Sequence, residues 1–403
     1  MVVGAGYSGL MAARTLAKGG LSVALLDAGD PGMGAATRNH GHIGGIGKLP
    51  AGLEKQVGLE TAARIKEDAV RARHFLNDLI KGENLDVDYV ERGRFMGAHC
   101  PAAYETYARN IEKYRKELGV TVHMVPRSEQ RSEIGSDFYY GGMVTQEAGA
   151  LQPAKLHREM RRLAEEAGVT ICGRAAVTGI EKTTSGRHRL QTARGEITCR
   201  HLVLATNAYT GGLNRFVRRR IVPLNAYMIA TEKLPLPLAE EILPTNRTGG
   251  DTKRALYAYR RSPDGQRIIF AGRAKFRSIP EAEAAPILHR FMLGVWPQLE
   301  GTRISHCWKG LIAFTQDHLP HVGENDGVHY IAGCNGSGVV VMTYLGHQLG
   351  LKILGQQDRP LGVDGLRFPP LPAYNGRPWF LPTVGRYYTF RDYLDRAFAG
   401  RFA

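Results

Sequence analysis

The chain opens on three closely spaced glycines, in the stretch MVVGAGYSGL. Gly4, Gly6 and Gly9 follow the pattern G-x-G-x-x-G, and two valines precede them. In a strand–turn–helix unit, the first glycine permits a tight turn, the second lets the backbone approach a pyrophosphate, and the third allows close packing of the helix on the strand. The pattern alone is a weak signal, so its surroundings decide what it means.

The residues that follow complete a nucleotide-binding unit. An alanine-rich helix is predicted over 10–18, and Gly19 ends it. The stretch LSVALLDAG then predicts a second strand ending in Asp27, 18 positions beyond Gly9, where a carboxylate would accept hydrogen bonds from a ribose. The helix N-terminus would offer the phosphates free N–H groups and a positive dipole end. A dinucleotide site is therefore predicted at this end of the chain.

Composition limits the other function classes. A chain of 403 residues predicts two structural units rather than one core. The net charge is +15, but the basic residues are dispersed and the dense cluster HREMRR (157–162) has no interleaved aromatics, so no nucleic-acid partner is expected. Five cysteines without a C-x-x-C pair predict no metal site and fit a reducing compartment. No apolar run approaches the roughly 20 residues of a transmembrane helix, so a cytoplasmic protein is expected.

Two further glycine-rich segments predict a long ligand. The stretch PGMGAATRNHGHIGG (31–45) is dense in small residues and hydrogen-bond donors. The stretch HYIAGCNGSGVVVMTYLGHQLG (329–350) repeats the order of strand, glycine-rich turn and helix. Its turn, 336–338, would direct backbone N–H groups and a helix N-terminus at a second part of the same ligand.

These blocks together resemble the D-amino-acid-oxidase superfamily of FAD-dependent amine oxidoreductases, most closely its glycine and sarcosine oxidase and gamma-glutamylputrescine oxidoreductase branch. The later blocks that carry the resemblance are GALQPAKLHREMRRLAEEAGVTICGRAAVTGIE (149–181), HLVLATNAYTGGL (201–213), WKGLIAFTQDHLPHVG (308–323) and PWFLPTVGRYYTFRDYL (378–394). The resemblance implies an α/β fold, with a Rossmann-like FAD-binding domain and a mostly antiparallel-sheet substrate domain. The implied division is 1–50, 148–215 and 305–365 for FAD, 51–147 and 216–304 for substrate, and 366–403 as a tail packed on the surface.

The resemblance also implies which residues bind FAD. Gly310 stands where covalently flavinylated relatives carry cysteine, so non-covalent FAD is expected. Phe270 stands where oxidases of the family place a lysine that promotes reaction with oxygen, which counts against fast oxidase activity. The implied cofactor-binding residues come from the N-terminal unit, the second glycine-rich loop and the later blocks: Gly4, Gly6, Tyr7, Ser8, Gly9, Asp27, Ala28, Ala36, Thr37, Arg38, Asn39, His40, Gly41, Val177, Ala205, Thr206, Gly310, Gly336, Ser337, Gly338 and Val339.

The implied reaction is oxidation of a C–N bond in a small amine or amino acid, with or without a carboxylate. A hydride would pass to flavin N5, and the resulting imine would hydrolyse to a carbonyl and an amine. Oxygen, giving hydrogen peroxide, or another acceptor would reoxidise FAD. Two alternatives stay open. One is a peripheral membrane dehydrogenase that feeds quinones through the PWFLP segment (378–382) and the basic surface. The other, not expected, is a flavoprotein acting on tRNA.

Histidines in the second glycine-rich loop are the first catalytic candidates. His42, with His40 beside it, would approach the reactive edge of the flavin and orient the amine or lower the pKa of its ammonium. An equally compatible interpretation is that each histidine only hydrogen-bonds the loop or the cofactor.

A predicted hairpin around the turn 262–265 supplies two more candidates. Alternation puts Ala258 and Arg260 on one face and Tyr259 on the other. Arg260 would clamp a substrate carboxylate, Tyr259 would enclose the apolar part of the substrate, and Arg273 is a further arginine candidate. Lys309 is predicted to assist oxygen as a nearby cation. The competing interpretations are exposed arginines beside a turn and a solvated lysine.

Overall fold

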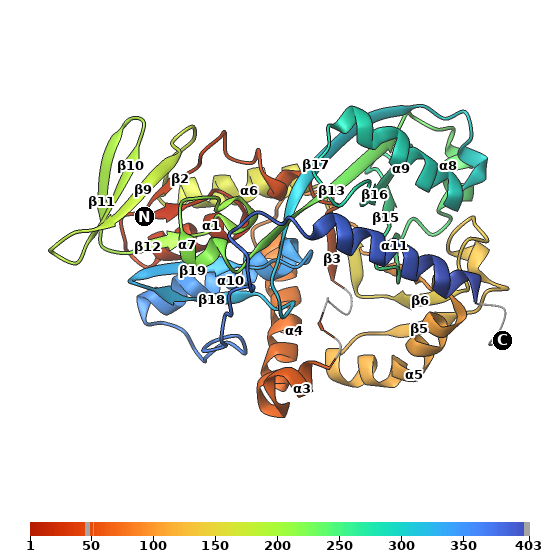
Figure 1. Cartoon of the computed structure of the whole chain (residues 1–403), viewed down its shortest axis with the longest axis horizontal. Helices are drawn as coiled ribbons and strands as arrows, with labels where there is room; N and C mark the ends of the chain where they lie inside the picture. The colour runs from red at the N-terminus through yellow and green to blue at the C-terminus, as the bar shows by residue number, and fades with distance from the viewer. Residues whose placement is uncertain (45–48, 51, 399–403) are drawn as a thin grey trace.

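The computed structural model describes residues 1–44, 49–50 and 52–398. Gly45, the last residue of the second glycine-rich loop, and the final residues of the tail lie outside the described residues. Two large sheets lie side by side and divide the molecule (Figure 1). The predicted α/β class is confirmed, because one sheet is mainly parallel and the other mainly antiparallel.

The first sheet has six strands, in which only the edge pair β18–β19 is antiparallel. Its parallel strands are short, and the central strands β1 and β12 are buried, as strands covered on both faces are. Helix α1 (Tyr7–Lys18) packs against α6 (Pro153–Glu166) and α10 (Gly338–Leu354). In spatial order the strands are β18 (His321–Asn325), β19 (Val328–Ala332), β12 (Leu202–Leu204), β1 (Val2–Val3), β2 (Ala24–Leu26) and β8 (Thr170–Cys172).

The second sheet has eight strands, and only β14 and β4 pair in parallel. One face packs against α9 (Glu281–Val295), around the fully buried Trp296. The predicted hairpin is confirmed, since β15 and β16 pair antiparallel and Gly265 N donates to Ser262 O at 2.8 Å. The spatial order is β17 (Ile304–Phe314), β13 (Val222–Thr231), β16 (Ile268–Gly272), β15 (Ala258–Arg261), β14 (Thr248–Asp251), β4 (Arg94–Gly97), β6 (Gly142–Thr145) and β5 (Val122–Val125).

Smaller elements connect and cover the two sheets. A three-stranded antiparallel sheet comprises β9 (Val177–Lys182), β10 (His188–Thr192) and β11 (Gly195–Cys199), and β3 (His42–Gly44) pairs with β7 (Ala148–Ala150). The remaining helices are α2 (Ala35–Arg38), α3 (Leu53–Val57), α4 (Leu59–Gly82), α5 (Pro101–Leu118), α7 (Arg215–Arg218), α8 (Leu236–Ile242) and α11 (Leu381–Ala397), and 3₁₀ turns occupy Gln130–Ser132, Asn207–Tyr209 and Pro297–Leu299.

Strand β17 joins the second sheet along its whole length, because Val222 to Thr231 of β13 pair with Phe314 to Ile304. The predicted FAD-binding domain was expected to resume near residue 305, which is the start of this strand. The three-segment division of the chain into domains stays a prediction.

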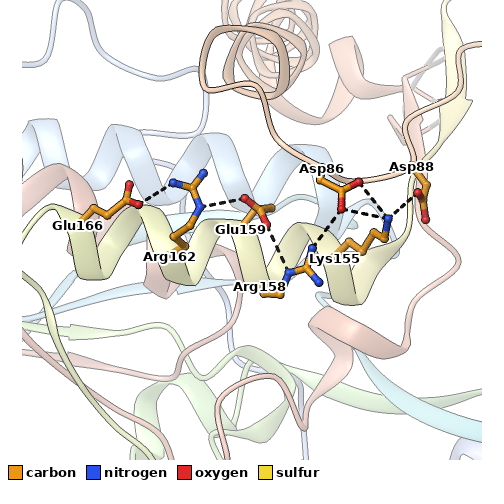
Figure 2. Close-up of polar contacts among 7 residues, drawn as sticks. All are labelled: Asp86, Asp88, Lys155, Arg158, Glu159, Arg162 and Glu166. Carbon is orange, nitrogen blue, oxygen red and sulfur yellow. Dashed lines mark hydrogen bonds and ion pairs between the residues drawn. The ribbon is translucent and has the colours of Figure 1, made fainter.

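The dense basic cluster of the sequence lies on α6 and is neutralised locally. Lys155 Nζ lies 2.7 Å from Asp88 Oδ1, and Arg162 Nη1 lies 2.7 Å from Glu166 Oε1. Figure 2 shows the chain of contacts along the helix, which joins Asp86, Asp88, Lys155, Arg158, Glu159, Arg162 and Glu166. Each such exposed pair contributes little stability, but together they leave no free basic stripe on this helix for a polyanion.

The tail runs without regular structure to Phe380 and then forms helix α11. Pro382 stands in the first turn of α11, where its missing N–H is tolerated. Arg254 Nη1 holds the helix through Asp392 at 3.0 Å and Asp395 at 2.6 Å. Trp379, which lies two residues before the helix begins, is 72% exposed. Among the described residues, no helix has both the length and the apolar composition to cross a membrane.

The packing of α1 on α10 generates a stability prediction. A Cβ added to Gly346 would lie 2.3 Å from Ser8 O, and a backbone oxygen cannot move aside as a flexible side chain does. Gly346→Ala should lower the free energy of unfolding by about 1–3 kcal/mol, the typical effect of overpacking, and should lower the thermal midpoint in circular dichroism. Gly294→Ala on α9 is the matched control, because a Cβ there meets nothing within 4 Å. Equal midpoints for the two variants would contradict the assigned close packing.

Candidate active site

A cavity of about 600 Å³ lies between the two sheets. It opens at the carboxyl ends of β1 and β2, where parallel sheets bind ligands, and its other wall is a face of the eight-stranded sheet. Most residues predicted to bind the cofactor line it, together with His42: Gly4, Gly6, Tyr7, Ser8, Asp27, Ala28, Ala36, Arg38, Asn39, His40, Gly41, Val177, Ala205, Thr206, Gly310, Gly336, Ser337, Gly338 and Val339. Gly9 and Thr37 are not among the lining residues.

The N-terminal turn is built from its glycines. Gly4 has φ +104°, a conformation that disfavours residues with a Cβ. A Cβ on Gly9 would lie 1.8 Å from Gly4 O, so the helix can begin only with glycine there. Gly6 is the N-cap of α1, and a Cβ on it would meet no protein atom within 4 Å. The turn therefore leaves open space at the positive end of α1, and this space is part of the cavity.

Asp27 links the turn to the second strand. Its Oδ2 accepts from Ala5 N at 2.8 Å, and its Oδ1 accepts from Gly29 N at 3.0 Å. A carboxylate has about four acceptor positions, so these two bonds hold the turn and leave capacity for hydroxyl donors in the cavity.

The second glycine-rich loop is fixed by internal hydrogen bonds. Asn39 Nδ2 donates to Ala36 O at 2.8 Å, while Asn39 Oδ1 accepts from Gly41 N at 2.8 Å. Thr37 Oγ1 donates to the carbonyl oxygen of Gly32. Asn39 and Thr37 thus hold the shape of the loop, a role that their residue types did not reveal in the sequence.

His40 and His42 lie in contact at the cavity wall. The distance from His40 Nδ1 to His42 Nε2 is 3.0 Å, and the rings meet edge to face with centroids 4.5 Å apart. Burial, with the positive charges of Arg260 and Arg94, holds the pKa of His40 well below its usual range. His40 is therefore neutral, so its Nδ1 can accept a hydrogen bond from His42 Nε2.

The third glycine-rich segment and β17 form the other side of the cavity. Helix α10 begins at Gly338, and its N-cap Ser337 makes no side-chain capping bond, so its N-terminus faces the cavity without a protein cap. Gly310 faces α2, where a Cβ would meet Ala35 and Arg38 at ordinary contact distances from 3.6 Å. Cys334 lines the cavity, whereas Cys307 does not.

Three of the four predicted catalytic residues are placed away from the cavity lining. Tyr259 is fully buried against Trp296, with ring centroids 5.0 Å apart. Arg260 shares the face of Ala258, but its Nη1 donates to Leu151 O at 2.8 Å behind the loop, and burial lowers its pKa to about 10. Lys309 Nζ donates to Ile279 O at 2.9 Å and lies 3.3 Å from Glu281. Their catalytic roles stay predictions, to which this placement adds no support.

Other arginines line the cavity instead. Arg273, a candidate from the sequence, lies near the rings of Phe276 and Phe314, and burial lowers its pKa to about 10. Arg73 on α4 and Arg94 on β4 also line it and were missed. The alternation of Arg94 with the buried Phe95 was the one available signal, since it puts Arg94 on the face opposite the core.

Comparison with known proteins is consistent with this geometry. The family described as "DAO: FAD dependent oxidoreductase" matches residues 1–350. Gamma-glutamylputrescine oxidoreductase of Escherichia coli (strain K12) is 28% identical over 402 residues, covering 98% of this chain and 92% of the relative. The crystal structure of glycine oxidase from Geobacillus kaustophilus superposes with a TM-score of 0.74 at 20% identity, covering 91% of this chain and 97% of that one. Iminodiacetate oxidase from Chelativorans sp. BNC1 gives a TM-score of 0.73 at 19% identity, covering 92% and 98%.

The open space at Gly6 generates a prediction about the cofactor. Gly6→Val should fold, because a Cβ at this position meets no protein atom within 4 Å, but it should purify with little flavin, because the side chain would fill the space expected for the pyrophosphate. The ratio of flavin to protein absorbance measures the loss, and circular dichroism measures folding. The control is Gly212→Val, at an exposed loop glycine with nothing within 4 Å. A folded Gly6→Val protein with full flavin content would overturn the assignment of this turn.

Proposed function

Because this chain belongs to the DAO family of FAD-dependent oxidoreductases, we propose that it oxidises the C–N bond of an amine or amino acid with FAD held in the cavity. One observation carries the proposal. A single cavity joins the N-terminal glycine-rich turn to a sheet face that is lined by small and apolar side chains and by arginines. Ligand sites of this kind bind a cofactor and a small substrate in one enclosed space.

The residues present fit FAD. The turn at Gly6 and the N-terminus of α1 would hold the pyrophosphate, and Asp27 would accept from a ribose. The flavin ring would lie between β17 at Gly310 and the 336–339 turn. When bound, FAD would accept a hydride at N5 from the carbon beside the nitrogen, leaving an imine that water hydrolyses to a carbonyl and an amine.

The N-terminus of α10 has an electrostatic role in this scheme. Negative charge develops on the pyrimidine part of a flavin that takes up a hydride. The uncapped first turn of α10 presents backbone N–H groups and a positive dipole end to the cavity. Fixed dipoles aimed at developing charge lower the barrier without reorganisation.

The histidine pair would manage the substrate proton. An amine gives up hydride only in its neutral form, so a proton must leave the ammonium. His42 would take this proton and donate from Nε2 to Nδ1 of His40, the two atoms that lie 3.0 Å apart. His40 stays neutral because of burial and of Arg260 and Arg94, so it serves as acceptor and holds the His42 ring in place.

The wall of the eight-stranded sheet would exclude water. Ala226, Met228, Ala258 and Ala271 line the cavity from three adjacent strands. A dry apolar wall strengthens the electrostatic interactions of the charged groups beside it and would delay hydrolysis of the imine until it leaves.

The electron acceptor is oxygen or another oxidant. Phe270 is fully buried in the core of the second sheet, and the described residues that line the cavity include arginines but no lysine. This supports a slow reaction with oxygen. A membrane-bound quinone acceptor stays an open alternative, to which the exposed Trp379 beside α11 is relevant.

The reaction class can be tested by anaerobic mixing with amines. We expect one group among sarcosine, glycine, D- and L-amino acids, N-alkyl amino acids and polyamine derivatives to bleach the visible absorbance of the flavin. Readmitted air should restore the colour slowly, and an added quinone or dye should restore it faster. Dithionite is the control for a reducible flavin. Bleaching by dithionite but by no amine would contradict the proposed substrate class.

The attachment of the flavin can be tested by denaturation. We expect acid precipitation to release all FAD into the supernatant, because Gly310 offers no thiol at the position where covalent relatives carry one. Cys334→Ser provides the comparison, because Cys334 is a thiol in the cavity lining. Flavin that stays with the wild-type polypeptide but leaves the Cys334→Ser variant would contradict non-covalent binding and identify the attachment point.

A further inference from the structure

A second, smaller cavity of about 40 Å³ lies beside the turn of the β15–β16 hairpin. Its walls come from the 88–93 segment, β7, the first residues of β14 and the end of β15. Among the described residues, none lines both this cavity and the larger one. Arg260, which the sequence suggested as a substrate-binding residue, lines the smaller cavity. The two cavities are therefore separate sites.

Arg260 stands between the second cavity and the loop that carries the histidine pair. Its Nη1 donates to Leu151 O at 2.8 Å, and a Cβ added to Gly41 would lie 3.0 Å from the same nitrogen. The residue is only 5% exposed, and its Nε has no hydrogen-bond partner in the part of the chain that the structure describes. The guanidinium thus holds the loop and still has an unused donor.

Arg261 and Thr248 add unused polar atoms to the lining of the same cavity. Arg261 Nε and Thr248 Oγ1 are buried and have no hydrogen-bond partner among the described residues. Thr248 is the next register position to Arg260, since Gly249 pairs with Tyr259 on the neighbouring strand. Buried polar atoms without partners are costly. Three of them around one cavity indicate a ligand that accepts several hydrogen bonds.

The charges around the second cavity favour an anion as that ligand. Three guanidinium groups, of Arg92, Arg260 and Arg261, line it together with one carboxylate, of Asp88. Asp88 Oδ1 lies 2.7 Å from Lys155 Nζ, as Figure 2 shows. None of the three guanidinium groups forms an ion pair with any residue that the structure describes. The lining therefore carries an excess of positive charge.

The nearest acid outside the lining does not relieve this excess. Burial lowers the pKa of Arg261, Glu240 on α8 acts in the opposite direction, and the charge of Arg92 adds to the lowering. The pKa of Arg261 is lowered overall, so burial and repulsion outweigh the attraction of Glu240. Two like charges are thus held near each other at the mouth of a cavity that contains unused donors.

A planar guanidinium binds oxyanions best, because its N–H groups form parallel hydrogen bonds. The volume restricts the ligand to a few atoms, since one water alone needs about 10–15 Å³. We propose that the second cavity binds a small oxyanion, such as inorganic phosphate or sulfate, through Arg260, Arg261 and Thr248, and that the bound anion shields the histidine pair from the charge of Arg260. The anion site does not depend on the proposed oxidation, whereas its effect on proton transfer does.

The shielding follows from the groups that face His40. Burial lowers the pKa of His40 most, the charges of Arg260 and Arg94 lower it further, and His42 lies 3.0 Å away. An anion beside Arg260 offsets one of these two positive charges, so the pKa of His40 should rise when the anion binds. A protonated His40 cannot accept from His42. Proton transfer in the proposed scheme should then fail at a higher pH than without the anion.

Calorimetry tests the site directly. Inorganic phosphate and sulfate are titrated into the oxidised holoenzyme, with sodium chloride at equal ionic strength as the control for screening. We expect oxyanions to bind and to raise the thermal midpoint with concentration, and chloride to do neither. Arg261→Gln should weaken phosphate binding about tenfold, the effect of a charged hydrogen bond. Thr248→Val should weaken it less. Without phosphate, Thr248→Val should be at least as stable as the wild type, because it removes a buried hydroxyl with no partner among the described residues.

Arg290→Gln is the matched control, because Arg290 on α9 is exposed and forms no ion pair with a described residue. It removes the same charge and should bind phosphate as the wild type does. Equal effects of phosphate and chloride on the wild type would overturn the site. Phosphate binding that neither Arg261→Gln nor Thr248→Val weakens would also overturn it. If Arg261→Gln fails to fold, Thr248→Val and Arg92→Gln decide by the same ratio.

The shielding is tested by NMR of histidine-labelled holoenzyme, with His40→Asn used to assign the signals of His40. Phosphate should raise the pKa of His40 in the wild type and raise it much less in Arg261→Gln at the same concentration. An unchanged titration of His40 in wild-type enzyme saturated with phosphate would overturn the shielding. A protein that binds phosphate as described but oxidises no amine would refute the proposed function and leave the anion site intact.

Discussion

The fold of the cofactor-binding side depends on the contact between Gly9 and the backbone of Gly4. Because any Cβ on Gly9 would lie 1.8 Å from Gly4 O, α1 begins directly against β1. Helix α10 then packs on α1 at a second point without room for a side chain, where Gly346 meets Ser8. Both helices begin at the same cavity. Their close packing therefore places the positive N-terminal ends of two helices beside one ligand.

The two sheets contribute different kinds of recognition. The first supplies backbone groups at glycine-rich turns, which suit the phosphates and ring edges that any bound FAD presents. The second supplies side chains that are mostly small or apolar, among them Ala226, Ala258 and Ala271. The charged side chains of this wall are a few arginines. We expect substitutions at these arginines to change substrate preference more than substitutions at the apolar positions.

Local patterns in the sequence predicted the glycine-rich units and the hairpin, because each follows from short-range periodicity and turn chemistry, whereas the α/β class was implied by the resemblance to a known family. These local patterns could not predict how deeply each side chain is buried. Arg260 is on the expected face, yet Leu151 covers it and the loop lies over it. Tyr259 packs in the core on the other face. Alternation with Phe95 could have put Arg94 on the face opposite the core, but the space its guanidinium occupies depends on Gly250, a residue 156 positions away on the neighbouring strand. The helix α11 was not predicted, because the tail was described only as a segment packed on the surface; Pro382 stands in its first turn, where a proline is tolerated.

The positions of the basic side chains say more about the ligands of this protein than its net charge of +15 does. On α6 the basic side chains pair with acids of the same helix and of the 86–88 segment, so they cancel where they stand (Figure 2). In the cavity, Arg94 and Arg73 have no acidic partner among the described residues, while the carboxylate of Asp27 lines another part of it. The net charge of +15 therefore says little about the ligand, because much of it is paired on the surface and only a few charged side chains line the cavity.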